Sequence, residues 1–278
     1  SKGDTRHDVA IGEMDETGVF TGALDQQVLD GEIDAAIHSL KDCPTDQHPE
    51  LEVAAIPARA TPLDMLVGLS TPRLSELEPG TTIGTSSRRR RANVLYENDR
   101  LHLKKCRGNV PTRLDKLNDD QYDGIIIAAA GLERVGKDLE QRPSIQRLIR
   151  TGEMLPAPGQ GALAVVCRSE DKETLETLRE IDHTPSHQIC GAERSLLATL
   201  EGGCQIPIGA LGSIRNDQLL LKASVTSPDG STRITGELKG PPEEYDSIGK
   251  QLAEDLIDRG ARELLSESAW LAERTKAV

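Results

Sequence analysis

The chain has 278 residues and a net charge of −13, with 36% hydrophobic and only 2% aromatic residues. This length predicts two domains or three small ones, with aliphatic cores. The acidic balance argues against nucleic acid or an anionic membrane as the general partner. Five cysteines without paired spacing, and no apolar run long enough to cross a bilayer, predict a soluble, cytoplasmic protein without a structural metal.

Strand-like and helix-like segments alternate through the first half of the chain. We expect helices at 22–29, from 88 and at 110–117, and strands at 33–39, 51–56, 65–69, 81–83 and 101–104. Residues 123–131 have the near-continuous apolar character of a central parallel strand. This order predicts α/β sheets with right-handed crossovers and ligands at the C-terminal ends of their strands.

The pattern changes after residues 154–161. We expect a strand at 162–167, helices at 172–181 and 187–200, and short strands with turns near Arg215 and Asp229. A long amphipathic helix over 243–265 follows. These elements predict a separate α+β module.

A positive segment interrupts this acidic chain. Between Thr81 and Arg113 there are nine Lys or Arg residues and two Asp or Glu residues, so the segment carries a net charge of +7. Small hydroxyl residues lead from a strand into a helix that begins at Arg88, and such a helix start binds anions. Arginines add bidentate recognition of carboxylate or phosphate. The segment predicts a site for a multiply anionic small molecule, and a solvated basic helix face is the alternative.

Two further places combine reactive side chains with a suitable backbone. Lys41 and Asp42 follow a predicted strand, where a carboxylate could transfer a proton or stabilise a cation, although an ordinary solvated loop pair fits the dipeptide equally. Cys204 lies beside two glycines that allow tight bending, and it is either an attachment site or a buried apolar residue. The segment 159–161 lacks the Lys-Ser/Thr of a phosphate loop and suits a hinge between domains.

Four segments together resemble the hydroxymethylbilane synthase (porphobilinogen deaminase) family. They read HSLKDCP at 38–44, GTSSRRR at 84–90, RGNVPTRL at 107–114 and LEGGCQIPIG at 200–209, in the family's order and spacing. The resemblance implies three domains. Two are α/β domains similar to type II periplasmic binding proteins, and the third is a C-terminal α+β domain. The implied boundaries are 1–57 with 158–175, then 63–152, then 178–278.

The resemblance also implies the reaction. Four porphobilinogen molecules are joined head to tail with loss of ammonia, giving hydroxymethylbilane for tetrapyrrole and haem biosynthesis. The growing linear tetrapyrrole is built on a dipyrromethane cofactor attached by a thioether to Cys204. The implied partners are this substrate and the growing chain, with neither nucleic acid nor membrane, and the protein is expected to be a monomer.

The family's functional residues map onto matching positions of this sequence. Asp42 matches the catalytic carboxylate, which stabilises the cationic species formed as ammonia leaves and moves protons at the pyrrole nitrogens. The binding positions fall into two groups, in which Cys204 holds the cofactor covalently, Phe20 lines the pocket, and the arginines, Ser86, Ser87 and Lys41 bind carboxylates. Cofactor-binding positions are Cys204, Lys41, Asp42, Thr85, Ser86, Ser87, Arg89, Arg90, Arg107 and Gly131. Substrate-binding positions are Arg107, Arg113, Arg134, Phe20 and Gln160.

Three alternatives stay open at this point. A solute-binding-type module for a polycarboxylate ligand shares the fold but has no use for Asp42 or an attached cofactor. An inactive truncated synthase is the second, because no segment matches the family's N-terminal Arg-x-Ser-x-Leu-Ala pattern. A nucleic-acid binder using residues 88–91 is the third, and it predicts affinity that falls steeply with salt.

Overall fold

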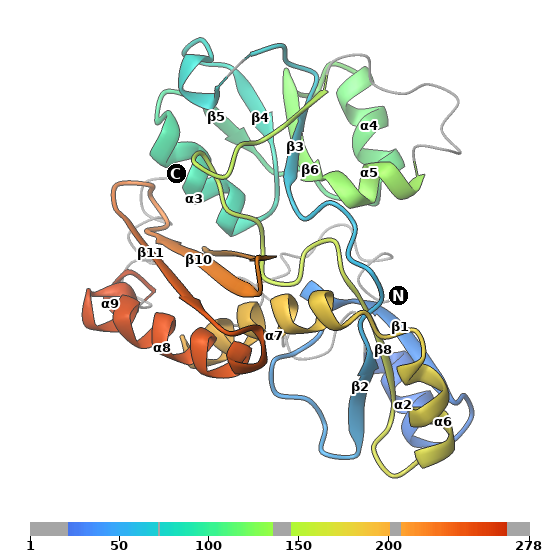
Figure 1. Ribbon diagram of the computed structural model, residues 1–278. Coiled ribbons are helices and arrows are strands. Elements are labelled where there is room, and N and C mark those ends of the chain that lie inside the picture. Colours follow the sequence, from blue (N-terminus) through green and yellow to red (C-terminus); the bar gives the residue numbers. More distant parts are fainter. Residues whose placement is uncertain (1–21, 72, 136–145, 201–206, 266–278) are drawn as a thin grey trace.

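The computed structural model describes residues 22–71, 73–135, 146–200 and 207–265. Figure 1 shows three groups of strands, each with its own helices. None of the helices in this described part of the chain has the length and apolar content needed to span a bilayer.

The first group is a three-stranded sheet in the order β1-β8-β2. Its elements are β1 (Ala35–Ser39), β2 (Leu51–Ala55) and β8 (Leu163–Arg168), with helices α2 (Gly22–Leu29) and α6 (Lys172–Arg179). Strand β8 pairs antiparallel with both neighbours, an orientation that the sequence analysis did not predict. The chain leaves this sheet after β2, forms the five-stranded sheet, and then returns as β8. Strand β8 lies between β1 and β2 and runs in the opposite direction to both.

The second group is a five-stranded sheet in the order β5-β4-β6-β3-β7. Its strands are β3 (Asp64–Val67), β4 (Thr82–Gly84), β5 (His102–Lys104), β6 (Gly124–Ala128) and β7 (Gln146–Leu148). Its helices are α3 (Arg88–Glu97), α4 (Val110–Asn118) and α5 (Ala129–Val135). Strand β6 is central as predicted, but it is parallel only to β4 and antiparallel to β3. The short edge strand β7 was not predicted, since three residues carry no periodic signal.

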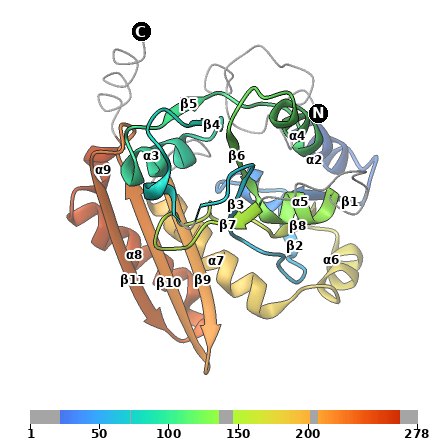
Figure 2. The same cartoon turned by 90° about the horizontal axis from the view of Figure 1, so that it is seen from above.

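The C-terminal group is an antiparallel sheet of β9 (Ile208–Arg215), β10 (Gln218–Thr226) and β11 (Arg233–Gly240). Positive φ angles of 49° and 55° at Asn216 and Asp217 form the tight turn between β9 and β10. Helices α7 (Thr184–Thr199) and α8 (Tyr245–Asp258) pack on one face (Figure 2). The single helix predicted over 243–265 is divided, because Gly260 adopts a φ of 91° between α8 and α9 (Ala261–Leu264).

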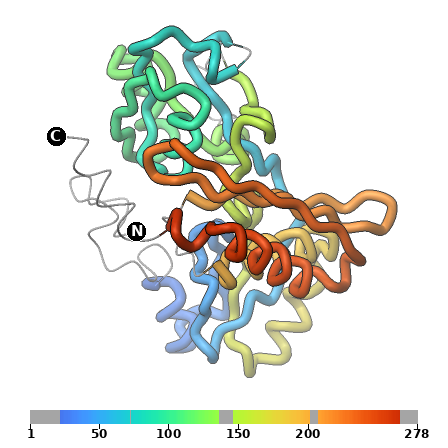
Figure 3. The backbone as a smooth tube through the Cα atoms, turned by 90° about the vertical axis from the view of Figure 1, so that its left-hand side faces the viewer, coloured from blue at the N-terminus to red at the C-terminus, as the bar shows by residue number. Residues whose placement is uncertain are grey.

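The C-terminal sheet lies beside both α/β groups (Figure 3). Helix α7 reaches the crossover segments that join those two groups. Arg59 in one crossover forms an ion pair of 2.7 Å with Glu193 of α7. The Gly159 N–H, in the other crossover, donates to the same carboxylate at 2.7 Å. One buried carboxylate therefore fixes both connections between the α/β groups. Short 3-10 turns lie at Leu40–Asp42, Leu74–Glu76 and Pro242–Glu244.

Candidate active site

The turn after β1 carries Lys41 and Asp42. Residues Leu40–Asp42 form a 3-10 turn that follows the strand directly. Leu40 is fully buried, and its N–H donates to the carbonyl oxygen of Ala162 at 3.0 Å, which fixes the turn against the start of β8. The predicted position of this pair at the C-terminal end of a strand is confirmed.

Burial changes the proton affinity of both side chains. It raises the pKa of the Asp42 carboxyl, against the opposing effect of nearby Lys41 and His38. It also lowers the pKa of Lys41, which Asp42 counteracts and the positive charge of Arg90 reinforces. A carboxyl with a raised pKa at a strand end is suited to proton transfer. The charge of Arg90 acts on Lys41, so the turn after β1 and the start of α3 are near enough to influence each other electrostatically.

Three hydroxyl residues shape the loop from β4 into α3. The Ser87 N–H donates to Thr85 Oγ1 at 3.2 Å, and Ser87 Oγ accepts from the Arg90 N–H at 3.4 Å as the helix N-cap. Ser86 Oγ donates to the carbonyl oxygen of Cys106 at 3.0 Å. Because Thr85 and Ser87 act as acceptors here, their hydroxyl hydrogens can donate to an anion.

The first turn of α3 turns two arginines inward onto one carboxylate. Arg89 Nη1 lies 2.7 Å from Asp64 Oδ2, and Arg90 contacts Asp64 Oδ1 through Nε at 3.0 Å and Nη2 at 2.8 Å. Gln160 Nε2 donates to the same Oδ1 at 3.0 Å. We call Asp64, Arg89, Arg90 and Gln160 the Asp64 cluster. The two arginines also donate to the carbonyl oxygens of Leu155 and Ile126.

The Asp64 cluster carries more positive than negative charge. Two guanidinium groups share one carboxylate, and all three side chains are at most 7% exposed. Although burial acts to raise it, the two arginines hold the pKa of Asp64 well below its usual range. Burial and the neighbouring Arg89 lower the pKa of Arg90 despite its contact with Asp64. A buried excess of positive charge is costly unless an anion approaches it.

Further arginines lie at the same edge of the five-stranded sheet. Strand β4 is parallel to β5 and β6, so the segments that follow these three strands meet at one edge. Arg107 and Arg113 follow β5, and Arg113 Nε donates to the Gly108 carbonyl oxygen at 2.7 Å. Arg134 follows β6, and its Nη2 donates to the Gly161 carbonyl oxygen at 3.1 Å. The structure thus brings the sequence-predicted arginines to one side of the sheet.

Other predicted positions have a different surrounding. Gly131 lies in α5 rather than at a strand end, because the strand predicted to reach it stops at Ala128. A Cβ atom at Gly131 would lie 3.3 Å from Val110 Cγ2, so glycine lets α5 pack closely on α4. Phe20 and Cys204 lie outside the described residues.

Asp64 is a site residue that the sequence reasoning missed. It is 2% exposed and begins the otherwise apolar strand β3. An acidic residue next to an apolar strand was the available signal, but the partner arginines lie 25 and 26 positions further along the chain.

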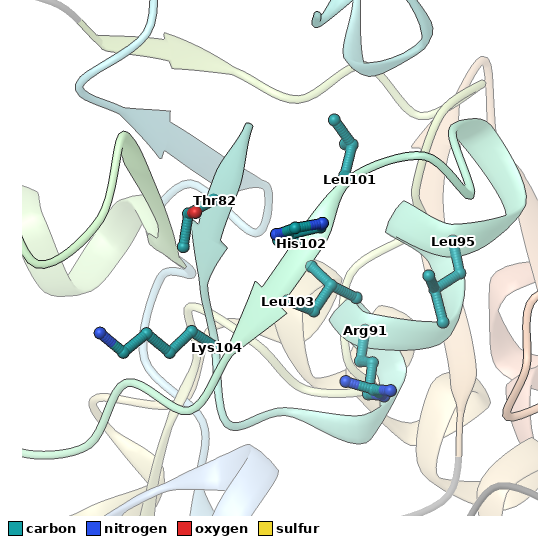
Figure 4. Close-up of a pocket in the computed structure, with 7 residues that line it drawn as sticks. All are labelled: Thr82, Arg91, Leu95, Leu101, His102, Leu103 and Lys104. Atoms are coloured by element: carbon teal, nitrogen blue, oxygen red, sulfur yellow. The ribbon is translucent and has the colours of Figure 1, made fainter. Parts of the chain in front are cut away.

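The arginine run also borders a pocket of about 460 Å³ on the edge of the same sheet. Figure 4 shows Arg91 beside Leu95 of α3 and His102 on β5, while Lys104 extends away from this group. Arg91 thus lines a pocket that includes neither Asp64 nor the turn after β1. On the same helix, therefore, Arg89 and Arg90 contact Asp64, whereas Arg91 lines this pocket.

Comparisons with known proteins match most of the amino-acid sequence. The family model "Porphobilinogen deaminase, dipyromethane cofactor binding domain" matches residues 1–176, and "Porphobilinogen deaminase, C-terminal domain" matches residues 187–258. The porphobilinogen deaminase of Pelotomaculum thermopropionicum is 41% identical over 96% of this chain and 84% of its own length. That of Prochlorococcus marinus strain MIT 9515 is 44% identical with the same coverage. The chain belongs to the porphobilinogen deaminase family.

Family membership decides against two of the alternatives, the solute-binding-type module and the nucleic-acid binder, and it does not test the third, the truncated synthase. The chain is an enzyme with porphobilinogen deaminase activity, also called hydroxymethylbilane synthase, and it acts in tetrapyrrole biosynthesis with a dipyrromethane cofactor. Among solved structures, a putative L-cystine ABC transporter protein of Listeria monocytogenes matches 57% of the chain at 10% identity, with a TM-score of 0.32. That score is too low to support an argument about fold or ligand.

The described residues fit a dipyrromethane group. Its pyrrole rings carry carboxylate side chains, which require hydrogen-bond donors and positive charge. The Asp64 cluster has one guanidinium more than its carboxylate can balance, and the Nε of Arg89 is buried without a hydrogen-bond partner among the described residues. A cofactor carboxylate would supply the missing negative charge.

Proposed function

We propose that the strand-end site of this enzyme joins four porphobilinogen molecules head to tail on a dipyrromethane primer held by Cys204. The observation that carries this proposal is the buried cluster of two arginines on one carboxylate, whose excess positive charge suits a carboxylate ligand. The three sheets support the domain boundaries 1–57 with 158–175, 63–152 and 178–278, which stay a prediction. A monomer in the cytoplasm is part of the same proposal.

In each condensation, a carbon–carbon bond forms between the aminomethyl carbon of porphobilinogen and the free α-carbon of the terminal pyrrole. The carbon–nitrogen bond breaks, ammonia leaves, and the α-hydrogen departs as a proton. When bound, the dipyrromethane group supplies the first pyrrole end for this reaction. Arg89, Arg90 and Lys41 bind its carboxylates, with the hydroxyls of Thr85 and Ser87 as further donors, while Ser86 holds the loop through its hydrogen bond to Cys106.

Asp42 is the proposed catalytic residue. Its carboxylate accepts a hydrogen bond from a pyrrole N–H and stabilises the positive charge that develops as ammonia leaves. Because burial raises its pKa, the same group can take up the proton that the reaction releases. Arg107, Arg113 and Arg134, together with Phe20 and Gln160, are assigned to the incoming substrate and the growing chain.

The Asp42→Asn variant tests this role. We expect turnover to fall by about 10²- to 10⁴-fold, the usual contribution of a positioned acid–base group, while the primer stays bound. Asp34→Asn is the matched control, because Asp34 is 86% exposed just before β1. Steady-state release of hydroxymethylbilane measures both. Equal turnover in Asp42→Asn and wild type would remove Asp42 from the mechanism.

Intact mass and a peptide map test the attachment to Cys204. The wild-type peptide is expected to carry the added mass of two linked pyrroles, and Cys204→Ser none. Cys167→Ser is the control, because Cys167 is a fully buried thiol of β8. An unmodified Cys204 peptide after incubation with porphobilinogen would contradict the attachment.

A further inference from the structure

Five consecutive backbone carbonyl oxygens at the end of β5, those of residues 104–108, are all held by hydrogen bonds from outside this segment. In chain order, their donors are the Thr85 N–H at 3.0 Å, Tyr122 Oη at 2.7 Å, Ser86 Oγ at 3.0 Å, Lys116 Nζ at 3.0 Å and Arg113 Nε at 2.7 Å. Four of these donors are side chains, whereas surface loops usually leave many backbone groups to water. We call residues 104–108 together with these five donors the carbonyl clamp.

The carbonyl clamp fixes the backbone that carries Arg107. Gly108 has a φ of 112°, and a Cβ atom there would lie 2.8 Å from Thr112 Cγ2, so this bend requires glycine. Directly afterwards, Asn109 Oδ1 accepts from the Thr112 N–H at 3.0 Å and caps α4. The path from β5 into α4 is therefore restrained at each step, and this path sets the position of the Arg107 Cα atom.

Tyr122 connects the carbonyl clamp to the loop that leads from β4 into α3. It is 7% exposed, and a Cβ atom at Gly84 would lie 2.8 Å from Tyr122 Cδ1, so its ring packs on the last residue of β4. Its hydroxyl donates to the Lys105 carbonyl oxygen at 2.7 Å. Burial raises the pKa of Tyr122 to about 12, so at neutral pH the hydroxyl keeps the proton that it donates. One side chain thus sets the spacing between two loops that carry predicted ligand-binding residues.

Lys116 of α4 holds the carbonyl oxygen of Arg107 itself. Its side chain is partly buried and turns back past the start of the helix, where Nζ donates at 3.0 Å. A lysine on a solvated helix face keeps its rotamer freedom, which is lost when the ammonium group is fixed on one acceptor. The charged donor compensates for this loss, because it makes a stronger hydrogen bond than a neutral one. Lys116 therefore orders the peptide group from which the Arg107 side chain extends.

We propose that Lys116 and Tyr122 are positioning residues that hold Arg107 for a carboxylate of the incoming porphobilinogen. The inference rests on the proposed function, in which Arg107 binds the substrate. A guanidinium pairs with a carboxylate through two N–H groups in one plane, so its backbone anchor has to be placed accurately. Lys116 and Tyr122 act on the carbonyl groups of Arg107 and of the residue two positions before it. An anchor that is ordered in advance avoids the cost of ordering it when the substrate binds.

Lys116→Met and Lys116→Arg, made in the full-length enzyme, test the inference. Methionine keeps an unbranched side chain without an N–H group, whereas arginine restores a charged donor. We expect the KM for porphobilinogen to rise about tenfold in Lys116→Met and kcat to change less than about twofold, because Arg107 binds a carboxylate away from the reacting atoms. Lys116→Arg should stay within about twofold of wild type in both constants. Steady-state kinetics measure both, on enzyme that intact mass shows to carry the primer.

Tyr122→Phe is the second variant, since it removes one hydroxyl and keeps the ring that packs on Gly84. It should raise the KM about threefold, the effect of one neutral hydrogen bond, again with little change in kcat. Lys250→Met and Tyr96→Phe are the matched controls. Lys250 is 57% exposed and pairs with Asp246 at 2.6 Å, and Tyr96 is 44% exposed on α3. Both controls should keep the wild-type KM.

A double variant shows whether Lys116 acts through Arg107. Arg107→Met alone should raise the KM, and adding Lys116→Met to it should raise the KM no further, because no guanidinium is left to position. Independent effects would instead multiply. A multiplied effect would mean that Lys116 binds the substrate directly or only supports the fold, and it would overturn the positioning role.

The outcomes separate the inference from the function on which it rests. A wild-type KM in Lys116→Met, or an equal rise in Lys116→Arg, would overturn the inference alone. A wild-type KM in Arg107→Met would instead overturn the proposed assignment of Arg107 to the substrate. Thermal denaturation confirms that the compared variants are folded. If Lys116→Met does not fold, Tyr122→Phe, which removes a single oxygen atom, decides the test by the same comparison with its control.

Discussion

Two buried ion-pair clusters in this protein differ in their charge balance. Arg59 and Glu193 form a two-pronged pair at 2.7 and 2.9 Å, one positive charge against one negative. The Asp64 cluster sets two guanidinium groups against one carboxylate. Burial acts to lower the pKa of both Arg59 and Arg90. Glu193 nevertheless raises that of Arg59, whereas the pKa of Arg90 stays lowered.

The difference separates a structural pair from a binding site. Glu193 also accepts from the backbone N–H groups of Gly159 and Gly212, so its hydrogen-bonding capacity is used within the protein. The Asp64 cluster retains positive charge that a ligand carboxylate can neutralise. The charge balance of a buried cluster therefore indicates its role: a neutral cluster stabilises the fold, and a cluster with excess positive charge can bind an anion.

Glu193→Gln should give the largest effect on stability. It leaves the Arg59 guanidinium, 8% exposed, without a counter-charge. We expect a loss of about 3–5 kcal/mol in the free energy of unfolding, measured by urea denaturation. Glu52→Gln is the control, because Glu52 forms a 3.4 Å pair with Arg179 on the surface, worth about 0–1 kcal/mol. Similar losses of unfolding free energy in the two variants would contradict the conclusion that the Arg59–Glu193 pair stabilises the fold.

Arg89→Met and Arg90→Met should mainly affect ligand binding. Each variant leaves one guanidinium on Asp64, so the cluster becomes balanced and the fold loses less stability than in Glu193→Gln. Loss of a hydrogen bond to a charged group, about 1.5–3 kcal/mol, should lower primer loading, and turnover with it, by about 10- to 100-fold. Steady-state kinetics and intact mass measure these effects. Arg91→Met is the matched control, because Arg91 lines the separate pocket with Leu95 and His102, and it should change neither.

Protonation of Asp64 at low pH should give the smallest of these predicted effects, a change in the free energy of unfolding. The folded-state pKa of Asp64 lies below the ordinary value of an aspartate, about 3.9, so its stabilising contribution is present above that pH and is lost as the pH falls below it. The difference in unfolding free energy between wild type and Asp64→Asn should be constant from neutral pH to about 5 and shrink at lower pH. Urea denaturation across this range measures it. A difference that grows on acidification would show that Asp64 is not held ionised by the arginines.

Much of the site could be predicted from the chain because its signals are local. A strand, small hydroxyl residues and a helix start at Arg88 are adjacent in sequence, and Ser87 caps α3. Lys41 and Asp42 directly follow the strand that presents them. Local hydrogen bonds and strand ends are set by neighbouring residues, so these positions did not depend on the rest of the fold.

The role of each arginine in the run could not be predicted in the same way. Successive helix residues point about 100° apart, yet Arg89 and Arg90 both reach Asp64 while Arg91 lines another pocket, so helix geometry alone does not assign the three side chains. Which of them faces Asp64 depends on how α3 packs on β3, more than twenty positions earlier in the chain. The attachment of β11 to α3 through Arg233 spans 136 positions to Glu97 and left no local signal.

The sequence by itself determined the elements, the positive segment and the resemblance in four motifs, since each depends on residues close together in the chain. Only the tertiary structure decided that β8 enters antiparallel between β1 and β2, and that Asp64 balances half of an arginine pair. These outcomes depend on long-range packing, in which the partner of a buried charge is the group that the fold brings within reach.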